Sequence, residues 1–154
     1  MIAYVGLGAN LGVPLATLRA ALAALRDTPG VELLRVSSAW RSAPVEAQGP
    51  DFLNAVAEVR SALPPHGLLA ALQAIEQRHG RERPYRNAPR TLDLDLLLFG
   101  ELALATPDLT LPHPRLHQRA FVLKPLAELA PARVRPEWLA ACADQRIERS
   151  PEAL

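Results

Sequence analysis

The chain has 154 residues, of which 49% are hydrophobic, and this is enough apolar material for one domain with one substantial core. Its formal net charge of +1 argues against wholesale binding to nucleic acid or to a membrane surface, because such proteins usually carry a larger basic excess. The single cysteine, Cys142, excludes an internal disulfide framework and a cysteine-rich zinc site, and it fits a reducing compartment.

No apolar stretch approaches the roughly 20 residues that are needed to span a bilayer, and the first residues carry no basic leader region. We therefore expect a cytoplasmic protein with no membrane partner, no nucleic-acid partner and a single domain over residues 1–154. Of the 17 basic residues only Lys124 is a lysine. The presence of an arginine alone therefore carries little information, and a functional role for an arginine has to be argued from its position in the chain.

The N-terminal segment predicts a strand and then an amphipathic helix. Residues 2–7 are typical of a short buried strand. The helix should begin at Pro14 and end before Pro29, with one apolar face formed by Leu15, Leu18, Leu22 and Leu25. Between them, Gly6, Gly8 and Gly12 are spaced one residue too widely for a dinucleotide-binding fingerprint, and no repeated strand-helix-strand unit follows. We interpret these glycines as a tight turn.

Two further strands are predicted over residues 31–40 and 52–60, joined by a loop that is too long for a tight hairpin. In the second of these strands one face should be core, and it carries Leu53, Ala55, Ala57 and Val59. Phe52 and Asn54 share the other face. An aromatic ring beside a carboxamide suits a flat heteroaromatic ligand with amide-like edges, although the same pair also occurs at an ordinary strand end.

After Pro64 a second helix is predicted to run to about His79, with its buried stripe formed by Leu68, Leu69, Leu72 and Ile75. Glu76 lies at the margin of that stripe, where it could equally pair with Arg78 or Arg81. The loop 81–90 that follows is rich in arginine. It leads directly into a strand with paired aspartates, and arginine forks beside a metal site are suited to hold a polyphosphate. A solvated surface loop is the alternative.

The strand that starts near residue 92 carries two acids, Asp93 and Asp95, in an otherwise apolar run. Side chains alternate along a strand, so these two should point the same way, about 7 Å apart. The leucines expected on the opposite face are Leu92, Leu94, Leu96 and Leu98. The two carboxylates could hold one divalent cation between them or one each. Paired acids on a solvent-facing strand are the alternative, but the run after Asp95 is too apolar for an exposed edge.

The C-terminal part predicts a short strand over 101–105, an extended segment over 109–114, a helix over 120–129 and a short helix near Trp138. Five separated blocks then carry a family resemblance: residues 4–12, 37–44, 50–55, 86–97 and 111–121. The block 86–97, Arg-Asn-Ala-Pro-Arg-Thr-Leu-Asp-Leu-Asp-Leu-Leu, resembles the signature of the 6-hydroxymethyl-7,8-dihydropterin pyrophosphokinase family of folate biosynthesis. The blocks cover about residues 2 to 130 in collinear order.

The resemblance implies an α+β, ferredoxin-like fold with a βαββαβ core, in which helices pack on an antiparallel-dominated sheet. The order of predicted elements agrees with that topology. It also implies an enzyme that transfers the terminal two phosphates of ATP, as one unit, to the hydroxymethyl group of the pterin. ATP would be the co-substrate, two Mg²⁺ ions would be required, AMP would be released, and the protein would be a monomer.

The resemblance also implies a role for individual residues. The catalytic set is Arg81, Arg90, Asp93 and Asp95, of which Asp93 and Asp95 would bind the metal ions. The residues expected to hold ATP are Gln73, Glu76, Arg81, Arg83, Arg90, Thr110, His113 and Arg119. The pterin would lie between the rings of Phe52 and Phe121, with its edge read by Asn54 and by the backbone around Ser42, Pro44 and Val45.

Several positions depart from better-known members of the family. Asn87 stands where many have tryptophan, and the loop 81–90 looks one residue shorter, which puts its closed geometry in doubt. Asp108 replaces an arginine seen in some members, and Pro114 replaces an aromatic residue.

Two alternative functions are kept. One is another Mg²⁺-dependent nucleotidyl or phosphoryl transferase that uses the paired aspartates. The other is an RNA-binding module, which the small net charge and the aromatic-poor strands disfavour.

Overall fold

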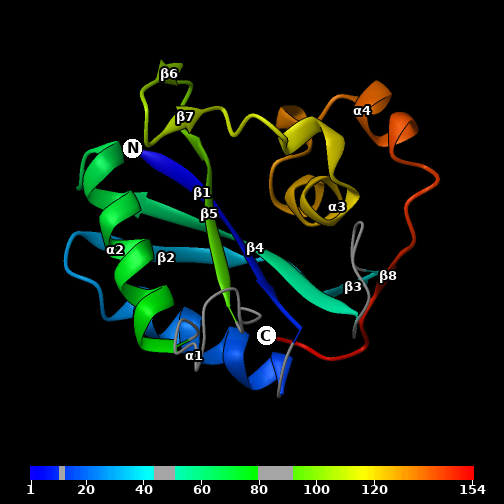
Figure 1. Cartoon of the computed structure of the whole chain (residues 1–154), viewed down its shortest axis with the longest axis horizontal. Coiled ribbons are helices and arrows are strands. Elements are labelled where there is room, and N and C mark those ends of the chain that lie inside the picture. The colour runs from blue at the N-terminus through cyan, green and yellow to red at the C-terminus, as the bar shows by residue number, and fades with distance from the viewer. Residues whose placement is uncertain (11–12, 44–50, 80–91) are drawn as a thin grey trace.

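A computed structural model describes residues 1–10, 13–43, 51–79 and 92–154 (Figure 1). The first half of the chain forms β1 (Ile2–Ala9), α1 (Pro14–Arg26), β2 (Val31–Val36), β3 (Trp40–Ser42), β4 (Phe52–Ser61) and α2 (Pro65–His79). The second half forms β5 (Asp93–Phe99), β6 (Leu104–Ala105), β7 (Thr110–Leu111), α3 (Ala120–Leu129), α4 (Pro136–Ala141) and β8 (Ile147–Arg149). Short 3₁₀ turns cover Leu116–Gln118 and Pro131–Arg133.

The main sheet is antiparallel throughout and has the strand order β5-β1-β4-β3-β8. Strand β2 also pairs with β4, so that β2 and β3 occupy successive lengths of the same neighbour. With β2 and β3 counted as one interrupted strand, the core order is strand-helix-strand-strand-helix-strand, which together with this sheet confirms the predicted α+β, ferredoxin-like class. The pair β6-β7 forms a separate small sheet.

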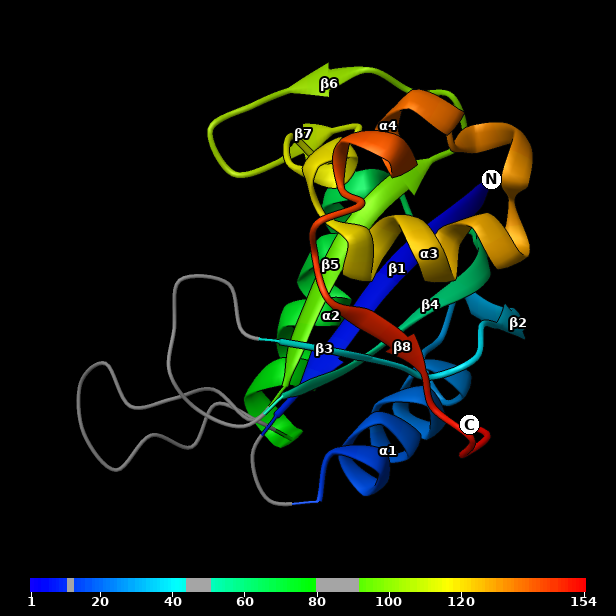
Figure 2. The ribbon, with the colours of Figure 1, turned by 90° about the vertical axis from the view of Figure 1, so that its right-hand side faces the viewer.

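Helices cover both faces of the sheet. Helices α1 and α2 lie on one face, and α3 crosses the other (Figures 1 and 2). The alternation of side chains along β1 explains this division, because Ala3, Val5 and Leu7 belong to the core under α1 and α2, whereas Tyr4 belongs to the core under α3. Within the described ranges, no helix combines the length and apolar character that crossing a membrane requires.

A bulge in β5 corrects one detail of the sequence prediction. Tyr4 is opposite Leu98, but the next residue, Val5, is opposite Leu96, so Leu97 is extra in the ladder. Leu97 and Leu98 therefore both contribute to the core under α3, and the predicted alternation holds only up to Leu96. The bulge lies beyond Asp95 and leaves the two aspartates on one face.

The strand predicted over 31–40 is interrupted. The hydroxyl of Ser37 accepts a hydrogen bond from the Val56 amide at 2.9 Å, and the Ser37 amide donates to the Val56 carbonyl at 2.9 Å. The Ser37 side chain thus takes a donor that a regular ladder would use, which separates β2 from β3. The strand predicted over 101–105 is shortened to Leu104–Ala105, because Gly100 has a positive φ of 55° and begins a turn.

A buried carboxylate joins the sheet to the end of α3. Glu58 on β4 accepts a hydrogen bond from the Tyr4 hydroxyl at 2.7 Å and two from the Arg35 guanidinium at 2.7 and 3.1 Å. Arg35 also donates to the Leu129 carbonyl at 2.7 Å. The hydrogen bonds from Arg35 lower the pKa of Glu58 below its usual value of 4.5, against the opposing effect of burial.

We expect Glu58→Gln to lower the free energy of unfolding at neutral pH by about 1 to 2 kcal/mol, because a charge-assisted bond is lost and Arg35 is half exposed. Because the pKa of Glu58 is lower in the folded than in the unfolded protein, the ionised carboxylate stabilises the fold at pH values above the ordinary pKa of 4.5. This contribution is lost as the pH falls through the pKa that Glu58 has in the folded protein. The difference between variant and wild type should therefore shrink below that pH in urea denaturation. Glu32→Gln, which removes the exposed partner of Arg60, is the matched control, and equal losses in both variants would contradict the assignment.

Candidate active site

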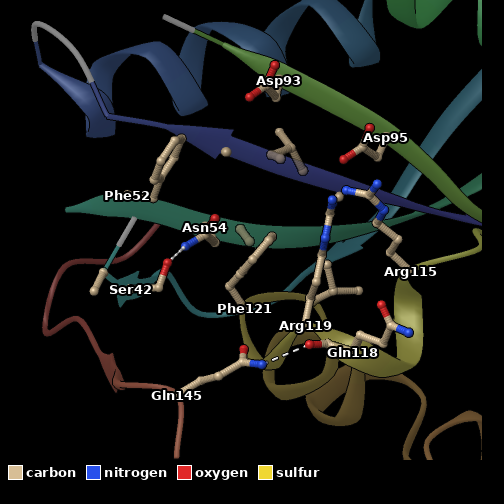
Figure 3. A pocket seen from close by; sticks show the side chains of 16 residues that line it. Ser42, Phe52, Asn54, Asp93, Asp95, Arg115, Gln118, Arg119, Phe121 and Gln145 are labelled. Carbon is tan, nitrogen blue, oxygen red and sulfur yellow. Dashed lines mark hydrogen bonds between the residues drawn. The ribbon is translucent and has the colours of Figure 1, made fainter. Parts of the chain in front are cut away.

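A cavity of about 650 Å³ lies between the sheet and the start of α3 (Figure 3). Its lining comes from β1, β3, β4 and β5, from the segment before α3, and from Gln145 near the C-terminus. Seven of the residues predicted from the sequence are brought together here: Ser42, Phe52, Asn54, Asp93, Asp95, Arg119 and Phe121.

One side of the cavity carries the paired acids. Asp93 and Asp95 project from β5 on the same side of the strand, as the alternation predicted, and both are partly exposed (Figure 3). The guanidinium groups of Arg115 and Arg119 reach toward Asp95 from the segment before α3 (Figure 3). Carboxylates on a strand that face the guanidinium groups of two arginines form a wall suited to a bound anion and its counter-ions.

The other side carries the aromatic rings and the carboxamide. Asn54 is 3% exposed, and its Nδ2 donates to the Ser42 hydroxyl at 2.7 Å and to the Trp40 carbonyl at 3.4 Å. Phe52 extends from the start of β4 and Phe121 from the first turn of α3 (Figure 3). Because Ser42 and Trp40 hold the Asn54 amide, its orientation is fixed before any ligand binds.

Two glycines of β1 form the floor between these walls. Gly8 is paired with Asn54 on one side and Asp93 on the other, and Gly6 is paired with Val56 and Asp95. A Cβ atom at Gly8 would lie 3.2 Å from the Asn54 Oδ1, so glycine is what leaves room for the amide. The turn that we predicted for Gly6 and Gly8 is therefore wrong, because both lie inside the strand; Gly12 is outside the described residues.

His113 lies beside the acidic wall without lining the cavity. Burial lowers the pKa of its imidazole below the ordinary 6.5; Asp95 opposes this shift, and Arg119 and Arg115 reinforce it. The Nδ1 atom accepts a hydrogen bond from the Arg115 amide at 3.2 Å. A neutral His113 with Nδ1 as acceptor carries its proton on Nε2, which is then available as a donor.

Three of the other residues predicted to hold ATP, Gln73, Glu76 and Thr110, are described by the structure and do not line the cavity. Gln73 on α2 and Thr110 on β7 are exposed and do not line the cavity. Glu76 is 6% exposed, and its Oε2 accepts a hydrogen bond from the Leu94 amide at 3.0 Å, between the two aspartates. That contact couples α2 to the carboxylate-bearing strand. Five predicted residues fall outside the described ranges: Pro44, Val45, Arg81, Arg83 and Arg90.

The cavity also contains residues that the sequence prediction missed. Gly6 and Gly8 could have been found, because their spacing of two places both on one face of a strand. Arg115 and Gln118 lie within the extended and 3₁₀ segment before α3, where no regular period applies. Gln145 follows α4 near the chain end, and its sequence context offers no signal for a site.

The donor set fits one class of metal ion. Across the described ranges no group of three or more His, Cys, Asp or Glu residues could hold a metal ion by itself. Asp93 and Asp95 supply two carboxylates at the cavity wall. Mg²⁺ is usually held by one or two carboxylates together with substrate phosphates, so two acids that line an open cavity fit it.

Comparisons with known proteins agree with this arrangement. A profile of the 7,8-dihydro-6-hydroxymethylpterin-pyrophosphokinase family matches residues 4–131. Proteins named 2-amino-4-hydroxy-6-hydroxymethyldihydropteridine pyrophosphokinase are 49% identical in Pseudomonas aeruginosa, over 97% of both chains, and 42% identical in Bacillus subtilis, over 94% of this chain and 86% of the relative.

A similar fold occurs in a solved structure described as HPPK-DHPS in complex with substrates. It has a TM-score of 0.64 and 13% sequence identity, and the match covers 84% of this chain and 40% of the longer one. At that identity the likeness concerns the fold alone. The family profile and the close relatives place the sequence more specifically, and the chain belongs to the 7,8-dihydro-6-hydroxymethylpterin-pyrophosphokinase family.

Proposed function

We propose that this enzyme transfers pyrophosphate from ATP to the hydroxymethyl group of 6-hydroxymethyl-7,8-dihydropterin and releases AMP, as a step in folate biosynthesis. Family membership supports the activity. The observation that carries the assignment of the site is one cavity with carboxylates and arginines on one side and a fixed carboxamide with two phenylalanines on the other. Such a cavity suits a polyphosphate next to a flat heteroaromatic alcohol.

The pterin would occupy the side of Asn54 and Ser42. The two N–H groups of the Asn54 amide are held by Ser42 and Trp40, so the Oδ1 atom is the group of this amide that would accept a hydrogen bond from the pterin edge. The rings of Phe52 and Phe121 would stack on the two faces of the pterin. The backbone at Pro44 and Val45 is proposed to complete the edge contacts.

The phosphates would lie on the side of Asp93 and Asp95. These two carboxylates would hold Mg²⁺, which when bound neutralises phosphate charge and aligns the reacting oxygens. Arg119 and the Nε2 of a neutral His113 would donate to phosphate oxygens. The other proposed nucleotide contacts are Gln73, Glu76, Arg81, Arg83, Arg90 and Thr110.

The chemistry requires positioning more than a protein nucleophile. The pterin hydroxyl attacks the β-phosphorus of ATP, and AMP leaves from the opposite side. Charge develops on the phosphate oxygens, so donors that are already in place stabilise it without rearranging. Arg81 and Arg90 are proposed to act there, each contributing about 2 to 4 kcal/mol to lowering the barrier.

Product analysis tests the activity. Incubation with ATP, Mg²⁺ and 6-hydroxymethyl-7,8-dihydropterin should yield AMP and a pterin diphosphate in equal amounts, with no AMP when the pterin is omitted. ADP or inorganic pyrophosphate as the sole nucleotide-derived product would instead indicate another Mg²⁺-dependent transferase. Salt-dependent RNA binding without turnover would indicate the binding module.

We further propose that residues 1–154 act as one domain and as a monomer, and that the protein works in the cytoplasm. The continuous sheet, which joins β1 to β8 near the two ends of the chain, supports one folding unit. The free and buried Cys142 fits a reducing compartment. Sedimentation equilibrium at catalytic concentrations should give the mass of a single chain, and a dimer mass would contradict the proposal.

Gly8→Ala should raise the pterin KM several-fold while changing the ATP KM little. The added Cβ would lie 3.2 Å from the Asn54 Oδ1 and would turn the amide away from its bond to Ser42. Gly6→Ala is the comparison, because its Cβ would contact the Leu97 side chain at 3.4 Å and leave Asn54 in place. A larger rise in pterin KM for Gly6→Ala than for Gly8→Ala, in steady-state kinetics with each substrate varied, would contradict the role given to Asn54.

A further inference from the structure

The segment from Gln145 to Arg149 lies beyond the residues that the family profile matches, yet its first residue borders the cavity. Gln145 itself lines the cavity, and its amide reaches back to the segment before α3 (Figure 3). The residues of the profile therefore do not account for everything that shapes the site.

The Gln145 side chain holds the backbone on both sides of Arg119. Its Oε1 accepts a hydrogen bond from the Ala120 amide at 2.9 Å, and its Nε2 donates to the Gln118 carbonyl at 2.8 Å. Arg119 is the N-cap of α3 and makes no side-chain cap of its own. A glutamine that is 25 residues away in sequence thus satisfies one of the N–H groups that the start of a helix leaves without an intrahelical partner.

Fixing these two peptide groups also fixes two side chains that line the cavity. Arg119 lies between them, and Phe121 follows in the first turn of α3. The Arg119 guanidinium carbon is 5.5 Å from the centre of the Phe121 ring, so the two side chains are in contact. At the point where α3 begins, the two Gln145 hydrogen bonds add to those that the Arg119 carbonyl accepts from the Val122 and Leu123 amides.

Neighbouring residues of the same segment contact the other elements of the pterin side. In the pairing of β8 with β3, Ile147 is opposite Ser42. Arg146 forms an ion pair with Asp51, the residue before Phe52, in which its Nη2 atom lies 3.0 and 3.2 Å from the two carboxylate oxygens. That ion pair is exposed and contributes little by itself. The Gln145 amide is less exposed, and both its oxygen and its nitrogen are hydrogen-bonded.

We propose that Gln145 is a positioning residue for the transfer reaction. It sets the first turn of α3 so that Phe121 and Arg119 are in place before the substrates bind. This rests on the proposed function, because it concerns the pterin and phosphate contacts of the same site. Without Gln145, the turn would have to be ordered by the substrate, and the cost of ordering would appear as weaker binding. At saturating substrate the turn is ordered again, so kcat should change little.

Three variants isolate this role. Gln145→Leu keeps the approximate size and removes both hydrogen bonds. Gln145→Glu keeps an acceptor for the Ala120 amide and places a negative charge near the N-terminus of a helix, where it is favourable. It loses the donor to the Gln118 carbonyl. Glu148→Ala changes an exposed residue of the same segment, on β8, as a control. Melting temperatures and circular dichroism establish that each variant is folded before its kinetics are compared.

The expected result is a rise of about fivefold to tenfold in pterin KM for Gln145→Leu, which is the size of a lost helix cap. Its kcat should stay within a factor of about two, because bound substrate restores the turn. Gln145→Glu should recover most of the affinity, and Glu148→Ala should match the wild type. If the pterin KM of folded Gln145→Leu stays at the wild-type value while only the melting temperature falls, Gln145 is merely structural and the proposal is overturned.

Hydrogen exchange on the wild-type protein gives a readout that needs neither a variant nor turnover. The Ala120 amide should exchange slowly in the free enzyme, because Gln145 accepts its hydrogen. Fast exchange of this amide in the free enzyme would overturn the proposal. A wild type that consumes no pterin would instead refute the proposed function, while the exchange rate would still report on the Gln145 contact.

Discussion

Asp95→Asn should lower kcat/KM by at least about a thousandfold and leave the fold intact, because loss of metal-assisted charge stabilisation raises the barrier by several kcal/mol. Asparagine matches the shape of aspartate but lacks the charge that would hold Mg²⁺ against the phosphates. Asp95 projects into the cavity and is only partly buried, so the substitution does not disturb the core. The effect should therefore fall on catalysis and not on stability.

Steady-state assays over a wide range of Mg²⁺ concentration measure this effect, and the melting temperature of the variant verifies the fold. Asp108→Asn is the matched control: it alters an exposed aspartate whose carboxylate lies 3.2 Å from the His66 ring and 3.0 Å from the Thr106 hydroxyl, away from the cavity. The control should keep the wild-type rate. Near-normal activity of Asp95→Asn at saturating Mg²⁺ would show that the metal role given to Asp95 is wrong.

Phe121→Ala should weaken pterin binding by about tenfold to a hundredfold, because stacking on an aromatic side chain is worth about 1 to 3 kcal/mol per base. ATP binding should weaken far less. The Phe121 ring also lies against the Arg119 guanidinium, and loss of that contact costs about 0.5 to 1 kcal/mol at a partly exposed site. The ATP affinity should accordingly fall by no more than about fivefold.

Dissociation constants from calorimetry, with each substrate titrated separately, distinguish the two effects. Phe121→Leu is the comparison variant, because it retains an apolar side chain in the first turn of α3 but removes the flat ring. Its pterin affinity should lie between those of the wild type and Phe121→Ala. Equal loss of both ligands in Phe121→Ala would point to collapse of this part of the site and not to a lost stacking contact.

The fold was predictable because local patterns determine it. The leucines of α1 and α2 recur at helical spacing, and the apolar positions of β4 alternate, so element types and their order followed from sequence. The interruption at Ser37 and the bulge at Leu97 did not, because each depends on a contact between strands that are distant in sequence. Such contacts alter a ladder without leaving a periodic signal.

The candidate site divides in the same way. The paired carboxylates could be placed on one face from their spacing alone, and Phe52 and Asn54 likewise. Phe121 was predicted only from the family resemblance, because no local sequence pattern indicates that α3 packs over the sheet. Gln145 could not be found at all, because its role depends on a chain end folding back onto a helix start.

The glycines of β1 show how a correct pattern can receive the wrong interpretation. Gly6 and Gly8 belong to a glycine cluster in the sequence, and such a cluster commonly indicates a turn. In the structure the Asn54 amide lies against Gly8 and the Leu97 side chain lies against Gly6, and the two glycines are paired with Asp93 and Asp95. Glycine inside a strand can thus mark the close approach of a side chain from the neighbouring strand as well as a change in direction.

Asp93 and Asp95 on one side of the cavity are proposed to form a single site with Phe52, Asn54 and Phe121 on the other side. Replacing Mg²⁺ by paramagnetic Mn²⁺ in the complex with a non-hydrolysable ATP analogue and the pterin tests it most directly. The hydroxymethyl protons of the pterin should relax much faster when Mn²⁺ is present, and Asp95→Asn should abolish that enhancement while the pterin stays bound. Relaxation that is unaffected by Mn²⁺ in the wild type, or unchanged by Asp95→Asn, would contradict the claim.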